Sequence, residues 1–367
     1  MRRYILISLI TYFAYKYYTQ DNTQDQCFVY SSSIQLKQFI KTNNQSNFCI
    51  RKSSPINLQN ATILMLCRNE DVFEVLETIQ NFEDRFNKRY HYDYTFFNDV
   101  PFSQEFIYLV SNFIPHGKIS FGLIPQAHWN YPPHIDQDKA REVRESFVDV
   151  PYGDSETYRH MCRFYSGFFY HHPLVQQYQY YWRTEPGVKL LCDVNYDVFQ
   201  YMQQNGKLYG YVLTLFEYSD TIPTLWQNVL EYIKLRDIEV KDSFELVINK
   251  FGWFNLCHFW SNFEIANLEV FNDDYDDFFQ FLDSNGGFYY ERWGDAPIHT
   301  LGIALFQNKS SIHWFDDIGY YHSPYLQCPQ DLNTYIDNKC VCDIDQDFGI
   351  TDLSCNRYFS SVLEDGV

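Results

Sequence analysis

"ATILMLCRNEDVFEVLETIQNF", residues 61–82, decides the fold because it joins two kinds of hydrophobic pattern. Its first part, 61–66, is a continuous apolar run that ends near polar Arg68 and Asn69, as a buried strand does. From Val72 onward, apolar residues return every three or four positions behind an acidic first turn, which predicts an amphipathic helix. A buried strand followed at once by such a helix is the first half of a β-α-β unit.

The segment "YDYTFFNDV", residues 92–100, completes this unit as a second strand that ends at Asn98 and Asp99. The predicted fold is therefore α/β with a mainly parallel central sheet. Ligands of such folds bind beyond the carboxyl ends of the strands, where Arg68 also lies. The chain has neither GxGxxG nor GxxxxGK[ST], so neither a dinucleotide fold nor a P-loop is indicated.

Composition narrows the class of ligand. The 367 residues include 28 basic and 47 acidic side chains, a net charge of −19, which argues against a nucleic-acid partner because no basic face is expected. A small anion held by local cations or by a metal stays open. Aromatic residues make up 20% of the chain. Most are expected in the core, but Tyr and Trp also stack on sugar faces, so carbohydrate is a candidate ligand.

The first residues, "MRRYILISLITYFAYKYY", place two arginines before a short apolar stretch. We interpret residues 1–19 as a cytoplasmic tail with an uncleaved signal-anchor in the membrane; a cleaved signal peptide is the alternative, although no small-x-small cleavage site follows. Residues 20–58 are rich in Gln, Asn, Ser and Thr and predict a polar stem rather than a packed element. Residues 59–367 are then a lumenal catalytic domain.

Four cysteines cluster near the C-terminus, at Cys328, Cys340, Cys342 and Cys355. Zinc is possible, but no CxxC pair is present. Disulfides that attach the C-terminal tail to the catalytic domain are favoured in an oxidising compartment, and four cysteines alone allow three connectivities.

The stretch "YYWRTEPGVKLLCD", residues 180–193, contains a candidate metal ligand. Glu185 follows a predicted strand and is fixed by a Pro-Gly pair, a position where sugar-nucleotide transferases hold a metal through an Asp-x-Asp pair. Here Gly187 occupies the third position, so the pair is incomplete. A turn carboxylate is the alternative role for Glu185.

Several long motifs occur in an order that resembles the fungal Golgi α-1,2-mannosyltransferases of glycosyltransferase family fifteen. The resemblance runs from about Asn60 to Arg357. It implies a type II Golgi membrane protein with a GT-A-like fold, which transfers mannose from GDP-mannose to a mannoside acceptor on glycoproteins with retention, using Mn²⁺. The motifs include "NATILMLCRNED", "YGDSETYRHMCRFYSGFFYHHPL", "NLCHFWSNFEIANLE", "GGFYYERWGDAPIHT" and "WFDDIGYYHSPY".

The resemblance also assigns a metal site to this chain. Glu185 would be one Mn²⁺ ligand and His322, in "GYYHSPY", the second, with diphosphate and water completing an octahedron. With Gly187 in place of an acid, the metal could bind more weakly or lean on Asp193. A packed core histidine is the alternative for His322.

Four further residues receive roles from the resemblance. Glu264 in "SNFEIA" matches the proposed nucleophile, and Asp295 in "RWGDAP" would contact mannose or acceptor. Tyr158 would bond the donor phosphate, and Arg68 would meet the guanosine or diphosphate. Glu264 as a surface acid and Asp295 as a helix N-cap are the structural alternatives.

The sequence allows two alternatives to a mannosyltransferase. One is a lectin-like member that keeps the pocket without turnover, and the other is a transferase with a different donor such as UDP-glucose.

Overall fold

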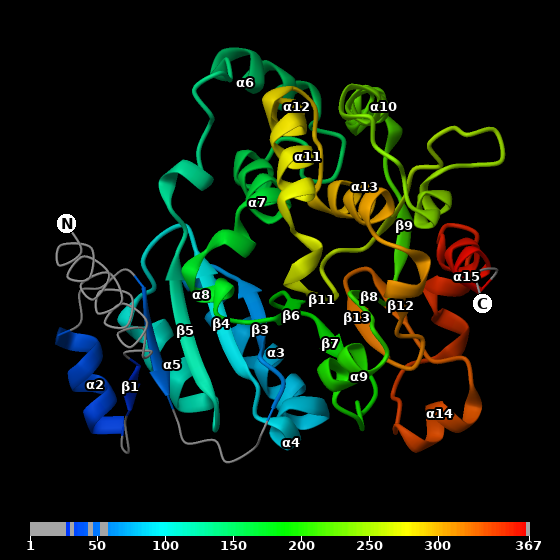
Figure 1. The fold of residues 1–367 in the computed structure, drawn as a ribbon. Helices are drawn as coiled ribbons and strands as arrows, with labels where there is room; N and C mark the ends of the chain where they lie inside the picture. The colour runs from blue at the N-terminus through cyan, green and yellow to red at the C-terminus, as the bar shows by residue number, and fades with distance from the viewer. Residues whose placement is uncertain (1–26, 30–32, 43–46, 52–57, 365–367) are drawn as a thin grey trace, which may run out of the picture.

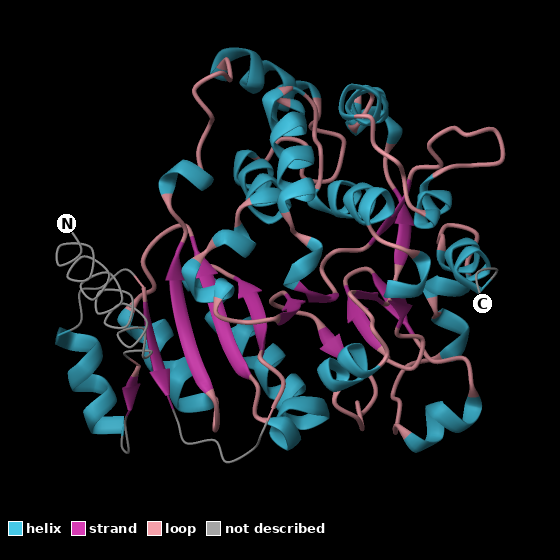
Figure 2. Cartoon of the chain, in the orientation of Figure 1, coloured by secondary structure: helices cyan, strands magenta, loops and turns pink. Residues whose placement is uncertain are grey.

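The computed structural model describes residues 27–29, 33–42, 47–51 and 58–364. Within them, the main sheet has nine strands in the order β1-β2-β5-β4-β3-β6-β11-β8-β12 (Figures 1 and 2). These are β1 (Phe28–Val29), β2 (Phe48–Arg51), β3 (Ala61–Leu66), β4 (Asp93–Asn98), β5 (Lys118–Leu123), β6 (Tyr180–Thr184), β8 (Tyr209–Tyr211), β11 (Glu264–Asn267) and β12 (Ile312–Trp314). Two small sheets hold β9 (Thr214–Phe216) with β10 (Cys257–Phe259), and β7 (Lys189–Leu190), β13 (Tyr320–His322) and β14 (Tyr325–Gln327).

The helices lie on both sides of this sheet (Figure 1). They are α2 (Ser33–Thr42), α3 (Val72–Phe82), α4 (Lys88–Tyr90), α5 (Gln104–Phe113), α6 (Gln137–Ser146), α7 (Glu156–Gly167), α8 (Pro173–Gln176) and α9 (Val198–Gln204). The second half of the chain adds α10 (Leu225–Arg236), α11 (Asp273–Ser284), α12 (Gly287–Tyr290), α13 (Asp295–Phe306), α14 (Leu332–Asp337) and α15 (Asn356–Glu364).

The predicted β-α-β unit is confirmed as β3, α3 and β4. β3 and β4 pair in parallel, with Thr62 opposite Asp93 and Leu66 opposite Phe97. β5 and β6 extend the parallel arrangement on either side. The mainly parallel α/β architecture expected from the sequence is therefore confirmed.

β11 interrupts the parallel order, and this insertion builds the site. It runs antiparallel between β6 and β8, so that Glu264 at its start lies opposite Arg183 near the end of β6. Side chains alternate along β6: Trp182 packs on Phe82 and Phe86 below the sheet, whereas Tyr181 and Arg183 project to the other face. The functional side of β6 is therefore the side covered by α7 and α13.

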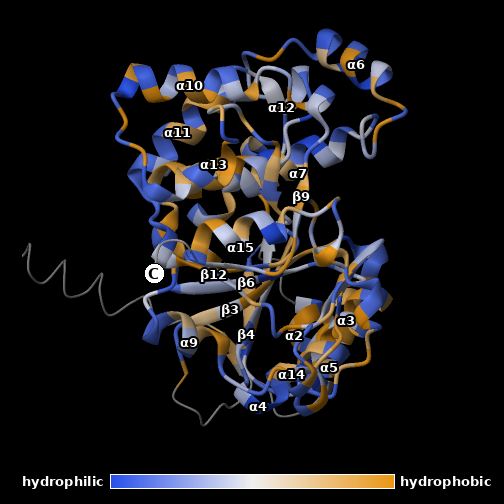
Figure 3. Cartoon of the chain, turned by 90° about the vertical axis from the view of Figure 1, so that its right-hand side faces the viewer, coloured by the Kyte–Doolittle hydropathy of each residue, from blue (hydrophilic) through white to orange (hydrophobic). Residues whose placement is uncertain are grey.

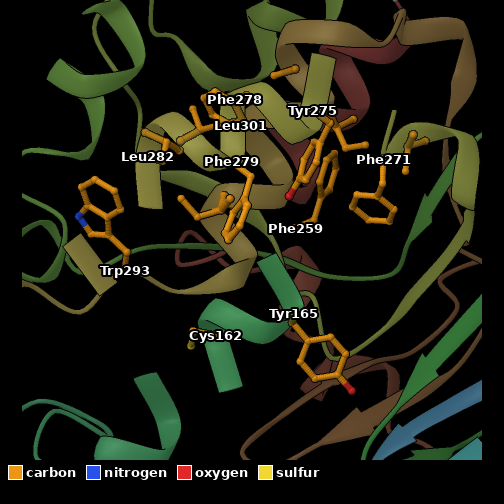
Figure 4. Close-up of a cluster of buried hydrophobic side chains, with 14 of the residues drawn as sticks. Cys162, Tyr165, Phe259, Phe271, Tyr275, Phe278, Phe279, Leu282, Trp293 and Leu301 are labelled. Carbon is orange, nitrogen blue, oxygen red and sulfur yellow. The ribbon is translucent and has the colours of Figure 1, made fainter. Parts of the chain in front are cut away.

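A large aromatic core fills the space between the sheet and the upper helices (Figure 4). Tyr165, Phe271 and Tyr275 pack there with residues of α11 and α13. Nearly every residue of α13 is buried, which agrees with its largely orange colour in Figure 3. A helix that is buried on nearly all sides forms only inside a core. α13 is thus a rigid support for the residue at its first position, Asp295.

The predicted stem, residues 20–58, needs a correction where the structure describes it. Leu36 and Ile40 of α2 are buried, and β2 lies in the main sheet between β1 and β5. The polar composition of this segment did not indicate these elements, because α2 buries only a narrow stripe of apolar side chains and β2 is four residues long. The described part of this segment therefore packs on the domain. The predicted anchor, residues 1–19, lies outside the described residues.

Disulfides attach the C-terminal tail to the domain, as predicted. Cys192 pairs with Cys340, Cys257 with Cys355, and Cys328 with Cys342. A fourth pair, Cys27 with Cys49, joins the N-terminal strands, while Cys67 and Cys162 are buried thiols. None of the described helices combines the length and apolar composition that crossing a bilayer requires.

Candidate active site

A cavity of about 360 Å³ opens beyond the carboxyl end of β6 and contains most of the predicted site residues. Glu185 directly follows this strand, Asp295 begins α13, His322 ends β13, and Tyr158 belongs to the first turn of α7. All four line the cavity. The fold thus brings together residues from four separate parts of the chain.

The side chains of Glu185 and His322 lie next to each other in the lining of the cavity. Glu185 Oε2 and His322 Nε2 are 3.4 Å apart, while His322 Nδ1 lies 3.0 Å from the Ser323 carbonyl oxygen. If Nδ1 donates to that carbonyl, Nε2 keeps a lone pair directed toward Glu185. Two adjacent ligands of an octahedral ion at about 2.1 Å are separated by about 3 Å. The pair therefore fits one small divalent cation.

Two protein ligands do not complete such a site. In the described part of the chain, no group of three or more His, Cys, Asp or Glu side chains is placed to hold a metal. The remaining positions must be filled by ligand oxygens and water, the usual situation for a cation that binds a diphosphate. Gly187 does not crowd the site: it adopts φ +84°, and a Cβ there would meet no atom within 4 Å.

The carboxyl of Glu185 is held in its ionised form. Burial acts to raise its pKa, but Arg183 and His322 outweigh burial and bring the pKa to about 2. For His322, burial acts to lower the pKa, and the Glu185 carboxylate outweighs it, so the pKa lies above the usual value. A divalent cation between them would compete with the proton on His322.

Arg183 is the functional residue that the sequence did not single out. Its side chain is 2% exposed, lines the cavity, and donates to Glu185 Oε1 at 2.8 Å and to Asp295 Oδ2. The guanidinium carbon lies 3.5 Å from the ring centroid of Tyr165. A charged residue within the otherwise aromatic strand "YYWRT" was the signal, because a buried cation requires a partner.

Asp295 is bound on the cavity wall by two donors. Arg183 and Ser261 both hydrogen bond to its Oδ2, the latter at 2.8 Å. Burial acts to raise the pKa of Asp295, but Arg183 outweighs it and the pKa lies below the usual value. The carboxylate is therefore charged and fixed.

Glu264 lies behind this wall and does not line the cavity. It is 0% exposed. Tyr209 donates to Oε1 at 2.8 Å, Tyr181 donates to Oε2 at 3.2 Å, and His299 Nδ1 lies 2.6 Å from Oε1. Arg183 Nη1 is 4.0 Å from Oε2. Burial acts to lower the pKa of His299, but Glu264 outweighs it and raises the pKa. Glu264 thus supports Arg183 from beneath the cavity.

Asp193 does not approach the metal position. Its carboxylate accepts from Arg85 at 2.8 Å and lies 3.4 Å from Lys339 Nζ. It does not line the cavity. The possibility that Asp193 coordinates the metal is therefore wrong, because Asp193 forms an ion pair with Arg85 that fixes the loop after β7.

A second cavity of about 210 Å³ adjoins the first, beyond the ends of β3 and β4. Arg68 lines it, and Arg68 Nη2 donates to Thr157 Oγ1 at 3.2 Å. Tyr152, Tyr158 and Met161 line both cavities. Tyr158 also accepts from Arg292 at 3.3 Å. The two cavities therefore form neighbouring compartments that share one wall.

Known proteins match this chain over most of its length. The sequence model of the glycolipid 2-alpha-mannosyltransferase family matches residues 17–363. The probable mannosyltransferase MNT3 of Candida albicans is 62% identical over 93% of this chain and 91% of its own. The alpha-1,2 mannosyltransferase KTR1 of Saccharomyces cerevisiae is 45% identical over 83% of this chain and 79% of its own.

Solved structures with the same fold are also available. The Mn/GDP form of core-mannan synthase A (CmsA/Ktr4) from Aspergillus fumigatus superposes with a TM-score of 0.78 at 34% identity, covering 85% of this chain and 87% of that one. The mannosyltransferase Ktr4p from S. cerevisiae in complex with GDP gives a TM-score of 0.71 at 37% identity, covering 88% and 84%.

Proposed function

Because the chain belongs to the glycolipid 2-alpha-mannosyltransferase family, we propose that it transfers mannose from GDP-mannose to a mannoside acceptor on glycoproteins, forming an α-1,2 linkage with retention of configuration. The observation that carries this proposal is the pair of neighbouring cavities with one shared wall. One compartment suits a nucleoside at the strand ends, and the other suits a diphosphate, a cation and a sugar. A nucleotide sugar has both parts.

In this proposal Glu185 and His322 hold a Mn²⁺ ion, as their separation and donor types allow. When bound, the ion would hold diphosphate oxygens and offset the charge on the departing GDP. Tyr158, on the shared wall, is placed to donate its hydroxyl to a phosphate oxygen. Arg68 is placed to approach the ribose or diphosphate from the nucleoside compartment.

Retention has two possible routes, and the geometry supports one. A covalent mannosyl-Glu264 would require this carboxylate to leave three hydrogen-bonding partners and to pass Arg183. In the same-face route, the acceptor hydroxyl attacks from the side on which GDP leaves, and its proton passes to the departing phosphate oxygen. Asp295 and, behind it, Glu264 then stabilise the cationic sugar carbon by charge.

An assay with the full-length protein tests the proposal. The protein, purified in detergent, is given a panel of nucleotide sugars and α-mannosides with Mn²⁺ or with EDTA. We expect mannose transfer from GDP-mannose that EDTA abolishes and Mn²⁺ restores. Transfer from UDP-glucose instead would show a different donor. Binding of GDP-mannose with no turnover on any mannoside would show the lectin-like alternative.

We also propose a Golgi location with type II topology, in which residues 1–19 anchor the chain and the domain, together with α2 and β2 that pack on it, is lumenal. Two observations support it. Eight of the ten cysteines form four disulfides, and disulfides persist in the secretory pathway. The proposed acceptors, glycoprotein glycans, are found in the same compartment.

A further inference from the structure

Both ring nitrogens of His299 face hydrogen-bond acceptors beneath the cavity. Nδ1 lies 2.6 Å from Glu264 Oε1, and Nε2 lies 2.9 Å from the Tyr165 carbonyl oxygen. A carbonyl oxygen can only accept, so Nε2 carries a proton. Tyr209 and Tyr181 also donate to the Glu264 carboxylate, which favours its ionised form and leaves the proton of the short contact on Nδ1. His299 is therefore an imidazolium.

The surroundings of this imidazolium are dry. His299 is 0% exposed on α13, and its ring packs among those of Phe169, Phe271 and Tyr275, with centroids 5.3 to 6.3 Å away. A charge in such a place is costly unless an opposite charge is paired with it. The ionisable groups that face His299 or the carboxylate it binds are Glu264 of β11, Asp295 of α13, Tyr275 of α11, Tyr165 of α7, Tyr181 and Arg183 of β6, and Tyr209 of β8.

His172 shows the effect of burial on a histidine that bonds to the backbone instead of an acid. It is 3% exposed, and its Nδ1 accepts from Leu174 N–H at 3.1 Å. Burial lowers the pKa of His172 to about 4, so this ring is neutral. Burial acts on His299 in the same direction, but Glu264 outweighs it and the pKa is raised. The charge of His299 therefore depends on its contact with Glu264.

We propose that His299 is a positioning residue for mannose transfer, whose imidazolium keeps the Glu264 carboxylate ionised and directed at Arg183. This rests on the proposed function. His299 does not line the cavity, so it acts through Glu264. His299 and Tyr209 occupy Oε1, which leaves Oε2 on the side of Arg183, 4.0 Å from its Nη1. Without the imidazolium, a fully buried carboxylate takes up a proton, and the negative charge behind Asp295 is lost.

Two amide variants separate the two bonds of His299. The amide nitrogen of His299→Asn falls near the place of Nδ1 and can donate to Glu264, whereas that of His299→Gln falls near Nε2 and can donate only to the Tyr165 carbonyl. Neither carries a charge. In the full-length protein with saturating Mn²⁺, His299→Gln should lower kcat by about tenfold or more and leave the affinity for GDP within about twofold. His299→Asn should lower kcat by only about threefold.

The pH profile of kcat supplies a readout that a purely structural role would not change. The proton on His299 is bound below its raised pKa and is lost as pH rises through that value. The kcat of the parent should therefore decrease on the alkaline side, above the ordinary histidine pKa of about 6.5. His299→Asn should lack this decrease, because an amide does not titrate. His322 is present in both proteins, so the difference between the profiles reports His299.

Proton NMR of the metal-free, full-length parent tests the bond without turnover. A proton on Nδ1 that is held by a carboxylate at 2.6 Å resonates far downfield of ordinary exchangeable protons. This resonance should be present at pH 6.5 and absent in His299→Gln and in Glu264→Gln. His172→Asn is the matched control, because it removes a buried histidine that bonds to the backbone. It should keep both the resonance and the pH profile of the parent.

Four results would overturn the inference. They are a parent without the downfield resonance, parental kcat in His299→Gln, an alkaline decrease that persists in His299→Asn, or equal losses of kcat and of melting temperature in both amide variants. If His299→Gln does not fold, the resonance and the His299→Asn profile still decide. In all these cases the parent transfers mannose from GDP-mannose, so the proposed function stands. A parent that transfers no mannose refutes the proposed function and, with it, this role of His299.

Discussion

At the scale of single residues, Arg183 determines the charge of the site. It contacts Glu185 and Asp295 directly and lies 4.0 Å from Glu264, so one cation offsets three acids. Its pKa is raised well above the usual value: burial acts to lower it, but the neighbouring Asp295 and the other acids outweigh burial. Removing Arg183 would leave buried carboxylates without a counter-charge, which is strongly destabilising.

The proposed metal ligands give the first residue-scale prediction. Glu185→Ala and His322→Ala should each raise the Mn²⁺ concentration needed for half-maximal activity and lower the maximal rate, because each removes one of the two proposed protein ligands. The melting temperature should change little, since both side chains are partly exposed. Mn²⁺ titration of mannose transfer checks this, with His134→Ala, an exposed histidine, as control. Variants that titrate like the parent would show that these residues are not ligands.

Glu264 gives the second prediction. Glu264→Gln keeps the shape but removes the charge beneath Arg183, so GDP-mannose should still bind with Mn²⁺ while kcat falls by about 10²-fold or more. Calorimetry and steady-state rates separate the two effects. Tyr181→Phe is the control, because it removes one hydrogen bond to the same carboxylate and keeps the charge. Parental turnover in Glu264→Gln would refute a role in the transition state.

At the scale of elements, the sequence predicted the strands and the helix that have a clear apolar periodicity. β3, α3 and β4 follow directly from the apolar pattern of residues 61–98. β11 was not predictable, because four residues carry too little pattern to show a strand, let alone an antiparallel one. The position of Glu264 behind Arg183 depends on that pairing, so its burial was not predictable either.

The same limit applies to the binding residues. Glu185, His322 and Asp295 belong to motifs to which the family resemblance assigns roles, although no local pattern shows that they share one cavity. The aromatic pattern of residues 180–184 predicts a buried strand but assigns no role to its single cation, Arg183. The partners of Asp193 lie far away in sequence, at Arg85 and Lys339, so only the fold shows that it is engaged.

The disulfides give an element-scale prediction. The Cys257–Cys355 bond closes a loop of 98 residues between β10 and α15, whereas Cys328–Cys342 closes one of 14 within the tail. Through loop-closure entropy, a disulfide that closes a loop of about 100 residues stabilises the folded state by about 5 kcal/mol, and one that closes about 15 residues by about 3 kcal/mol. The double Ser variant at Cys257 and Cys355 should therefore unfold at lower denaturant than the matched variant at Cys328 and Cys342.

Denaturant unfolding of the two double variants decides the point, and non-reducing peptide mapping of the parent verifies the pairs. The reverse order of stability would mean that chain entropy is not what these bonds contribute. A parent in which all four C-terminal cysteines are free thiols would contradict the pairing itself, and a zinc site would then have to be reconsidered.

At the scale of the whole molecule, the orientation across the membrane is the remaining prediction. Arg2 and Arg3 precede the apolar stretch, so the N-terminus should stay cytoplasmic and the domain should be lumenal. Protease added to intact vesicles should spare the bulk of the chain and digest it after detergent is added. Edman or mass-spectrometric analysis should find the original N-terminus. A mature protein that begins near residue 20 would show a cleaved signal instead.

The long-range pairing of the site also has a consequence for when the enzyme becomes active. Tyr181 and Glu264 are 83 residues apart in sequence, and Arg183 and Asp295 are 112 apart. Contacts of such separation carry a large loop-closure entropy and are slow to form, whereas the β3-α3-β4 unit is local. A nascent chain in which β13 has not yet docked against β7 has no positioned His322. We therefore expect the cavity to be complete only after β13 has joined the rest of the domain.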